Sequence, residues 1–258
     1  MRKVKLGKHK VTLYDSIDEL PIVRFHKYSK MLLVDAGVGS DINDFDAHIE
    51  RAVRYIRGGN NEDAAKELEN LRQNVFLILQ EQSVKDLSFA CLVAEIDGKP
   101  CDDLSEQGLA EVIRTLGGVP RKEIASSLEE AKKKIDTELT QYFPDLFDDV
   151  ASREYYDTMK RRTVAVLDGI INGESEEQKQ KVDEMTERMI LYVRPKTFAG
   201  KQSVEIQHDK GFEDMCLTIS RETHADAKRM TVLEFYNAYE YIVRIQKERQ
   251  KSVAKRKI

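Results

Sequence analysis

Residues 31–41 have the sequence MLLVDAGVGSD, and this stretch decides the fold because it permits two incompatible structures. In one, a short apolar strand enters a glycine turn, Asp35-x-Gly37-x-Gly39, of the kind that binds phosphates or adenosyl groups in doubly wound α/β folds. In the other, a helix ends at a glycine and a newly capped helix follows at once. The first structure predicts an α/β enzyme, and the second predicts a series of packed helices.

The residues around the stretch favour two helices. The third glycine of the nucleotide-binding turn is missing, because positions 41 and 42 are Asp and Ile. A doubly wound sheet needs further alternation of strands and helices, and residues 42–194 show helical patterns without a convincing strand. We therefore expect a helix that ends near Ala36, a left-handed turn at Gly37 or Gly39, and a fresh cap at Ser40 or Asp41.

The composition suits solvated helices that each carry one apolar stripe. The 258 residues are 41% hydrophobic and 34% charged, and the net charge is −4. Three cysteines without a C-x-x-C pair indicate a reducing compartment. The N-terminus lacks the apolar core of a signal peptide, and no run approaches the roughly 18 apolar residues that cross a bilayer. These features predict a cytoplasmic location and no membrane partner.

Capping residues and glycines divide the chain into about eight to ten helices after an N-terminal hairpin. Residues 3–14 alternate with period two around a Gly-Lys-His turn, which predicts a β-hairpin. The expected helices share an amphipathic 3.6-residue period: they span about 21–36, from 41 to Gly58, from Asn61, from Ser83 to before Gly98, from Asp103 to Gly117, from Pro120 through Leu139, about 152–172, from Ser175 to before Pro195, about 212–221, and from Thr231 onward. Short turns favour antiparallel helical hairpins.

The pattern predicts a mainly α fold with four parts. These are a β-hairpin arm at 1–15, a helical domain at 16–194, a linker at 195–211, and a C-terminal helical module with a basic tail at 212–258. The linker contains the alternating sequence SVEIQ at 203–207, which predicts one short strand.

Two clusters of potential metal ligands have simpler explanations. The carboxylates Asp35, Asp41, Asp44 and Asp46 do not match a calcium loop, because Ile42 and Phe45 belong to the apolar core of a helix; acidic residues in a first helical turn are ordinary partners of the helix dipole. His208, Cys216 and His224 lie close in sequence, but their spacing matches no compact zinc motif and a fourth ligand is not evident. We therefore predict no metal, cofactor or catalytic residue.

The C-terminal region supplies the candidate partner interface. Phe235, Tyr236, Tyr239 and Tyr241 place four aromatic residues within seven positions, more than one core stripe needs. Exposed tyrosine is a favoured interface anchor, although core packing also explains part of this cluster. The basic run at 247–257 could hold phosphates or an acidic surface, but it contains no aromatic residue that would stack on bases, so nucleic acid is a minor alternative.

Two segments resemble proteins of tailed bacteriophages, particularly crAss-like and related phages. The first is LPIVRFHKY at 20–28, which runs into DAGVGSD at 35–41; the second is MTVLEFY at 230–236, which is similar to the closing helix of some tail structural and tail-assembly proteins. The resemblance covers about 40 residues and transfers no functional residue. It implies a virion structural component or an assembly factor that is not an enzyme.

The sequence therefore predicts a protein that acts by contact with other virion or assembly proteins in the host cytoplasm or the virion, with self-association left open. The alternatives are an enzyme that uses a nucleotide or adenosylmethionine at Asp35-x-Gly37-x-Gly39, and a nucleic-acid-associated factor that uses the basic tail.

Overall fold

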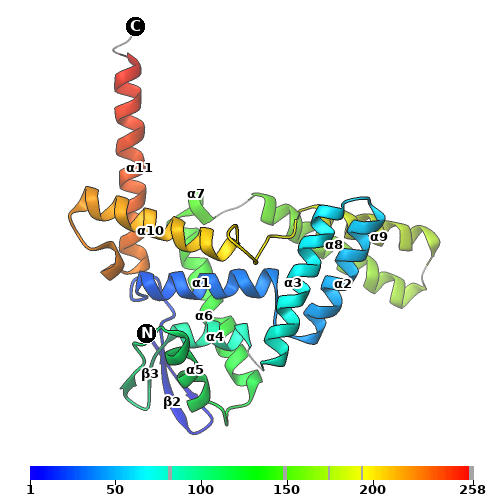
Figure 1. The fold of residues 1–258 in the computed structure, drawn as a ribbon, viewed down its shortest axis with the longest axis horizontal. Coiled ribbons are helices and arrows are strands. Elements are labelled where there is room, and N and C mark those ends of the chain that lie inside the picture. Colours follow the sequence, from blue (N-terminus) through cyan, green and yellow to red (C-terminus); the bar gives the residue numbers. More distant parts are fainter. Residues whose placement is uncertain (81–82, 148–149, 174, 193, 256–258) are drawn as a thin grey trace.

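The chain has a mainly α fold with a small antiparallel sheet at one end, as the sequence predicts (Figure 1). The computed structural model describes residues 1–80, 83–147, 150–173, 175–192 and 194–255. The described helices are α1 (Ile22–Gly37), α2 (Ile42–Arg57), α3 (Asn61–Leu79), α4 (Val84–Leu92), α5 (Glu106–Thr115), α6 (Arg121–Tyr142), α7 (Pro144–Phe147), α8 (Val150–Asn172), α9 (Glu176–Tyr192), α10 (Val204–Thr223), the short 3-10 turn η1 (Ala227–Arg229) and α11 (Val232–Lys255). The strands are β1 (Arg2–Leu6), β2 (His9–Leu13), β3 (Val93–Ile96) and β4 (Lys99–Pro100).

Residues 31–41 form the corner between α1 and α2, so the glycine-turn alternative is wrong. Helix α1 continues to Gly37, and Gly39 takes the left-handed conformation at φ +66°. Asp41 then caps α2, because its carboxylate accepts from the backbone N–H groups of Asn43 (2.8 Å) and Asp44 (3.0 Å). Asp44 reciprocates by accepting from the Asp41 N–H, which completes a capping box.

Each glycine of the corner has a packing reason to be glycine. A Cβ on Gly37 would overlap the ring of Phe198, and a Cβ on Gly39 would overlap the carboxyl group of Asp44. The missing side chains at the two positions thus leave room for the Phe198 ring and the Asp44 carboxyl group.

The predicted N-terminal hairpin is confirmed, but the sheet is larger than the sequence indicates. Strands β1 and β2 pair antiparallel, β2 pairs with β3, and β3 pairs with β4. The helix expected to run almost to Gly98 ends at Leu92, where the backbone turns extended and the Leu92 carbonyl accepts from the Tyr14 N–H at 2.9 Å. A short apolar run fits a buried helix or a buried strand equally well, and pairing with β2 decides the outcome.

The predicted strand at 203–207 is also wrong. Ser203 is the N-cap of α10, and its hydroxyl accepts from the Glu205 N–H at 3.3 Å. Helix α10 therefore begins well before the expected residue 212. The alternation in this segment does not reflect a sheet, because no described strand lies beside it.

One hydrophobic core joins the two ends of the chain. The five positions predicted for the buried face of α6 are all buried: Ile124, Leu128, Ala131, Ile135 and Leu139. The same core contains Leu6 of β1 and Phe235 of α11. Backbone hydrogen bonds join residues 20–22 to residues 230–232, with Val232 N–H donating to the Leu20 carbonyl at 2.9 Å. The proposed domain boundaries stay predictions.

Arg24 of α1 is a buried cation that organises the sheet end of the core. Its guanidinium donates to the carbonyl oxygens of Cys91 (3.3 Å), Val93 (2.9 Å) and Cys101. The Arg24 side chain is only 4% exposed, and its ion pair with Asp102 (3.2 Å) reaches the surface. The guanidinium thus satisfies carbonyl groups that the turn from α4 into β3 would otherwise leave without donors.

Helices α2 and α3 form a hairpin whose internal contact is unexpectedly polar. The residues buried along it are His48, Ala52, Tyr55, Asp63, Ala64, Glu67, Asn70 and Asn74. The His48 Nδ1 lies 2.6 Å from a Glu67 carboxylate oxygen, and the second oxygen of Glu67 accepts from Arg51 at 2.9 Å. The apolar face of α2 that should have been core points outward instead, with Ile42 63% exposed.

The corner gives a first prediction. Replacing Gly39 by Ala should lower the free energy of unfolding by ~1 kcal/mol for the left-handed backbone and by a further ~1 kcal/mol for displacement of the Asp44 cap. Gly59→Ala is the matched control, because Gly59 has φ +75° and no atom lies within 4 Å of the place where a Cβ would stand. Urea denaturation of both variants measures the difference, and equal losses would contradict the capping explanation.

Candidate functional site

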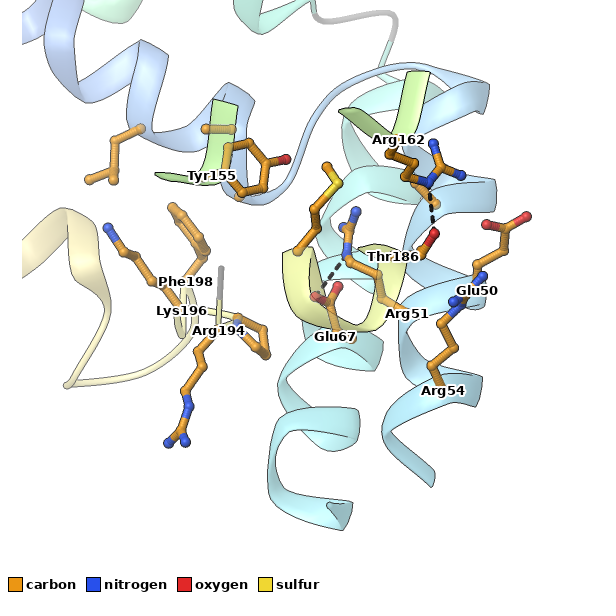
Figure 2. Close-up of a pocket in the computed structure, with 16 residues that line it drawn as sticks. Glu50, Arg51, Arg54, Glu67, Tyr155, Arg162, Thr186, Arg194, Lys196 and Phe198 are labelled. Carbon is orange, nitrogen blue, oxygen red and sulfur yellow. Dashed lines mark hydrogen bonds and ion pairs between the residues drawn. The ribbon is translucent and has the colours of Figure 1, made fainter. Parts of the chain in front are cut away.

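A cationic pocket of about 370 Å³ lies where α1, the α2–α3 hairpin, the α8–α9 hairpin and the segment 194–198 meet (Figure 2). Five basic residues line it: Arg51, Arg54, Arg162, Arg194 and Lys196. The acidic residues that line it are Glu50 and Glu67. Gly37 and Phe198 form part of its wall, so the corner that begins α2 also shapes this pocket.

Some of the pocket's cations are already engaged and others are not. Arg51 donates to Glu67, and Arg162 donates through Nε to the Thr186 hydroxyl at 2.7 Å (Figure 2). Among the described residues, no ion pair is formed by Arg54 or Lys196, whereas Arg194 lies close enough to Asp63 to help lower the pKa of that carboxyl group. The pocket therefore holds an excess of positive charge that its own residues do not neutralise.

Arginine guanidinium groups around one concavity can bind carboxylate or phosphate oxygens with paired hydrogen bonds. The chemistry that this pocket supports is thus the binding of an anion. The sequence does not indicate this pocket, because its cations come from residues 51–54, 162 and 194–196, which only the folded chain brings together. The charges of these separate segments carry no local motif.

A second polar cluster joins α1 to α10. His26 donates from Nε2 to Asp209 at 2.9 Å, and Lys30 donates to the other Asp209 oxygen at 2.7 Å. The ring of His208 stacks on that of His26 with centroids 4.5 Å apart, and Phe212 stacks on the other face of His26 at 4.0 Å. These contacts fix the crossing of the two helices.

Burial controls the ionisation of this pair of histidines. It lowers the pKa of His26, although the hydrogen bond to Asp209 opposes the effect. Burial and the neighbouring His26 also lower the pKa of His208. His208 contacts the Ser29 hydroxyl through Nε2 at 3.2 Å, while its Nδ1 is buried without a hydrogen-bond partner. A proton on Nδ1 would therefore have no acceptor.

The histidine cluster does not make a convincing metal centre. His26, His208 and Asp209 offer ligand atoms that all lie within 4.8 Å of one another. However, the Lys30 ammonium already occupies Asp209, and the two imidazole rings are nearly parallel, at 12°. Among the described residues, the sequence set of His208, Cys216 and His224 forms no such group.

The structure separates the four aromatic residues predicted to form a partner interface. Phe235 is fully buried. Tyr236 packs edge-on against Phe25 and Phe147, and burial raises its pKa to about 12. Tyr239 is half-buried, whereas Tyr241 is exposed beneath the Arg244 guanidinium. Tyr241 is thus the most accessible of the four residues, and the interface itself stays a prediction.

The basic tail at 247–257 begins on α11, but the side chains of residues 250–258 lie outside the described part. A role in nucleic-acid binding also stays a prediction.

Comparisons with protein-family models, curated proteins and solved structures found no match to this chain. Within the described residues, no helix combines the length and apolar character needed to cross a membrane.

The pocket gives a second prediction. Inorganic phosphate, added at constant ionic strength, should raise the melting temperature because a ligand that binds only the folded state stabilises it by mass action. The double variant Arg162→Ala/Arg194→Ala should lose most of this rise. Arg188→Ala, an exposed change on α9 outside the pocket lining, should keep it. An equal rise in all three proteins would contradict anion binding in the pocket.

The stacked histidines give a third prediction. Since their pKa values are lowered in the folded state, the unfolded chain takes up protons more readily below about pH 6.5, and stability should fall between pH 7 and pH 5. His208→Gln should make this fall shallower, as measured by urea denaturation at each pH. His224→Asn, which changes an exposed histidine at a left-handed position, is the control. A variant slope as steep as the wild-type slope would contradict the role of His208.

Proposed function

We propose that this chain is a non-enzymatic interaction protein of a tailed bacteriophage, either a virion structural component or an assembly factor for the head–tail or tail region. The observation that carries the interaction role is the outward apolar surface of its two helical hairpins. The resemblance of residues 20–41 and 230–236 to phage proteins supports the assignment to a tailed bacteriophage.

The outward apolar surface is substantial on both hairpins. On α2 and α3, Ile56 is 53% exposed and Leu79 is 76% exposed. On α8, Leu167 is 52% exposed, Ile170 is 70% exposed and Ile171 is 77% exposed. Single apolar residues on a surface are ordinary, but several large apolar side chains exposed within one or two turns of a helix, as on α8, are typical of protein–protein contacts.

The hairpins are also placed to make contacts. They lie together at the end of the molecule away from the sheet, while α11 extends in another direction (Figure 1). The sheet, α6 and α10 surround the shared core, and this leaves the hairpins as surfaces that a partner can cover. The cationic pocket between the hairpins adds a site for an acidic group of a partner.

The experiment is to trace a tagged chain through a productive infection. A structural component should remain with virions through density-gradient purification at a constant ratio to the major capsid protein. An assembly factor should be missing from purified virions but should co-purify with tail proteins from infected cells. If the chain binds no phage protein in either fraction, the proposal is wrong.

A variant with four substitutions tests whether the apolar surface of the hairpins makes these contacts. Replacing Leu167, Ile170 and Ile171 on α8, and Ile56 on α2, by Ser should weaken association with partners at least tenfold. The circular dichroism spectrum of the variant should match that of the wild type, because all four residues are exposed. Serine at the exposed positions of α5 or α6 should have no such effect. Unchanged association of the hairpin variant would assign the contacts to another surface.

A further inference from the structure

We propose that the outer face of α2 is a self-association surface, on which a second copy of this chain packs antiparallel about a two-fold axis. The inference deepens the proposed interaction function by naming one partner, and it rests on the exposure, spacing and charge order of α2.

The apolar stripe of α2 is exposed along the whole helix. The exposed fractions are 63% for Ile42, 39% for Ile49, 39% for Val53 and 53% for Ile56. These positions follow three- and four-residue spacing, which places them on one face of the helix. Such a stripe can pack against a second helix.

The stripe lies on the side of the hairpin that faces away from the cationic pocket. His48 and Ala52 contact α3, and the residues one position later, Ile49 and Val53, are turned about 100° from that contact. The residues one position earlier, Ala47 and Arg51, line the pocket on the opposite side. The apolar face therefore lies on a different side of α2 from the pocket, and its four apolar residues are all exposed.

Helix α3 extends the same face. Leu68 follows the buried Glu67, just as Ile49 follows the buried His48, and the two helices run antiparallel. In an antiparallel pair of helices, one step along each helix from the residue at the shared contact turns the next side chain toward the same side of the hairpin. Leu68 is 49% exposed and so adds to the face that α2 presents.

The charges at the edge of the stripe fit a second copy. The exposed residues Asp46 and Arg57 lie five and six positions on either side of residue 51, and Ile49 and Val53 each lie two positions from it. An antiparallel copy with its two-fold axis near residue 51 therefore places Asp46 opposite Arg57 of the second copy and Ile49 opposite Val53 of the second copy. No ion pair joins Asp46 or Arg57 to any residue in the described ranges, so both charges are available.

The contact has an apolar centre and a polar rim. Ile49, Val53, Ile56 and Leu68 form the centre, and exposed polar residues around them, among them Asp46 and Arg57, widen the contact toward the roughly 1,000 Å² of total buried surface that a specific interface needs. Two antiparallel hairpins packed face to face make a four-helix bundle, in which short loops and stripes of this spacing are usual. A two-fold axis also closes the assembly and leaves no repeated face for further growth.

The test is a charge exchange measured by sedimentation equilibrium on the purified full chain. The wild type should dimerise at micromolar concentrations. Asp46→Arg and Arg57→Asp should each weaken association at least fivefold, because each places like charges across the contact. The double variant Asp46→Arg/Arg57→Asp should return to within about twofold of wild type, because the opposite charges are restored. Glu184→Arg, an exposed reversal on α9, should leave association unchanged.

A second variant separates the apolar contact from the charges. Val53→Asp, close to the axis, should yield monomers that keep the wild-type circular dichroism spectrum. The proposal is overturned if the wild-type chain is still monomeric at about 100 micromolar. It is also overturned if the Val53→Asp variant still dimerises, or if the double variant Asp46→Arg/Arg57→Asp associates no better than the single variants. These outcomes are independent of virion association, since a monomer can still belong to a virion and a dimer can exist without one.

Discussion

The position of the α2–α3 hairpin depends on the carbonyl oxygen of Val38, at the end of α1. It accepts hydrogen bonds from His48 of α2 at 2.9 Å and from Asn74 of α3 at 3.1 Å. A carbonyl group at a helix end has no partner within its own helix, so these two side chains satisfy it from the next two helices. The Ser40 hydroxyl also accepts from the Val84 N–H, which brings the start of α4 to the same corner.

The polar contact within the α2–α3 hairpin has a consequence for its surface. Buried polar groups such as His48 and Glu67 fix one arrangement, because a shift of the helices would leave them without partners. Since polar residues occupy the internal contact, the apolar residues of α2 are left for the outside. The hairpin thus has a specific internal register and an external surface suited to other chains. An ordinary amphipathic helix turns its apolar side toward the core and its polar side toward solvent, whereas α2 does the opposite.

The sequence predicts those features that depend on neighbours along the chain. Asp41, Ser83 and Thr231 are caps in the structure, as their local sequences indicate, and the period of α6 identifies its buried residues. Features that depend on distant partners could not be predicted in this way. Val93 becomes a strand because β2 lies beside it, and the outward direction of Ile49 depends on the polar residues of α3.

The residues of the candidate site are even harder to predict from the sequence, because they come from distant parts of the chain. No spacing along the chain connects Arg51 with Arg162 and Arg194, and only the meeting of two hairpins places them around one cavity. The stacking of His26 on His208 likewise requires the crossing of α1 and α10. The sequence shows the histidines but not which of them lie together. His208 is grouped with His26 and Asp209 in the structure, not with Cys216 and His224, which are closer to it in the sequence than His26 is.

The hydrogen bonds between residues 20–22 and residues 230–232 bear on the synthesis of the chain. Ribosomes add about 5–20 residues per second, so roughly 10 to 40 s separate the appearance of Leu20 from that of its partner Val232. During this interval the apolar side chains around Ile17 and Leu20 lack the helix that covers them in the folded protein. The molecule therefore completes its core only after all of α10 and the first part of α11 have left the ribosome, and until then its first helices are exposed to chaperones and to aggregation.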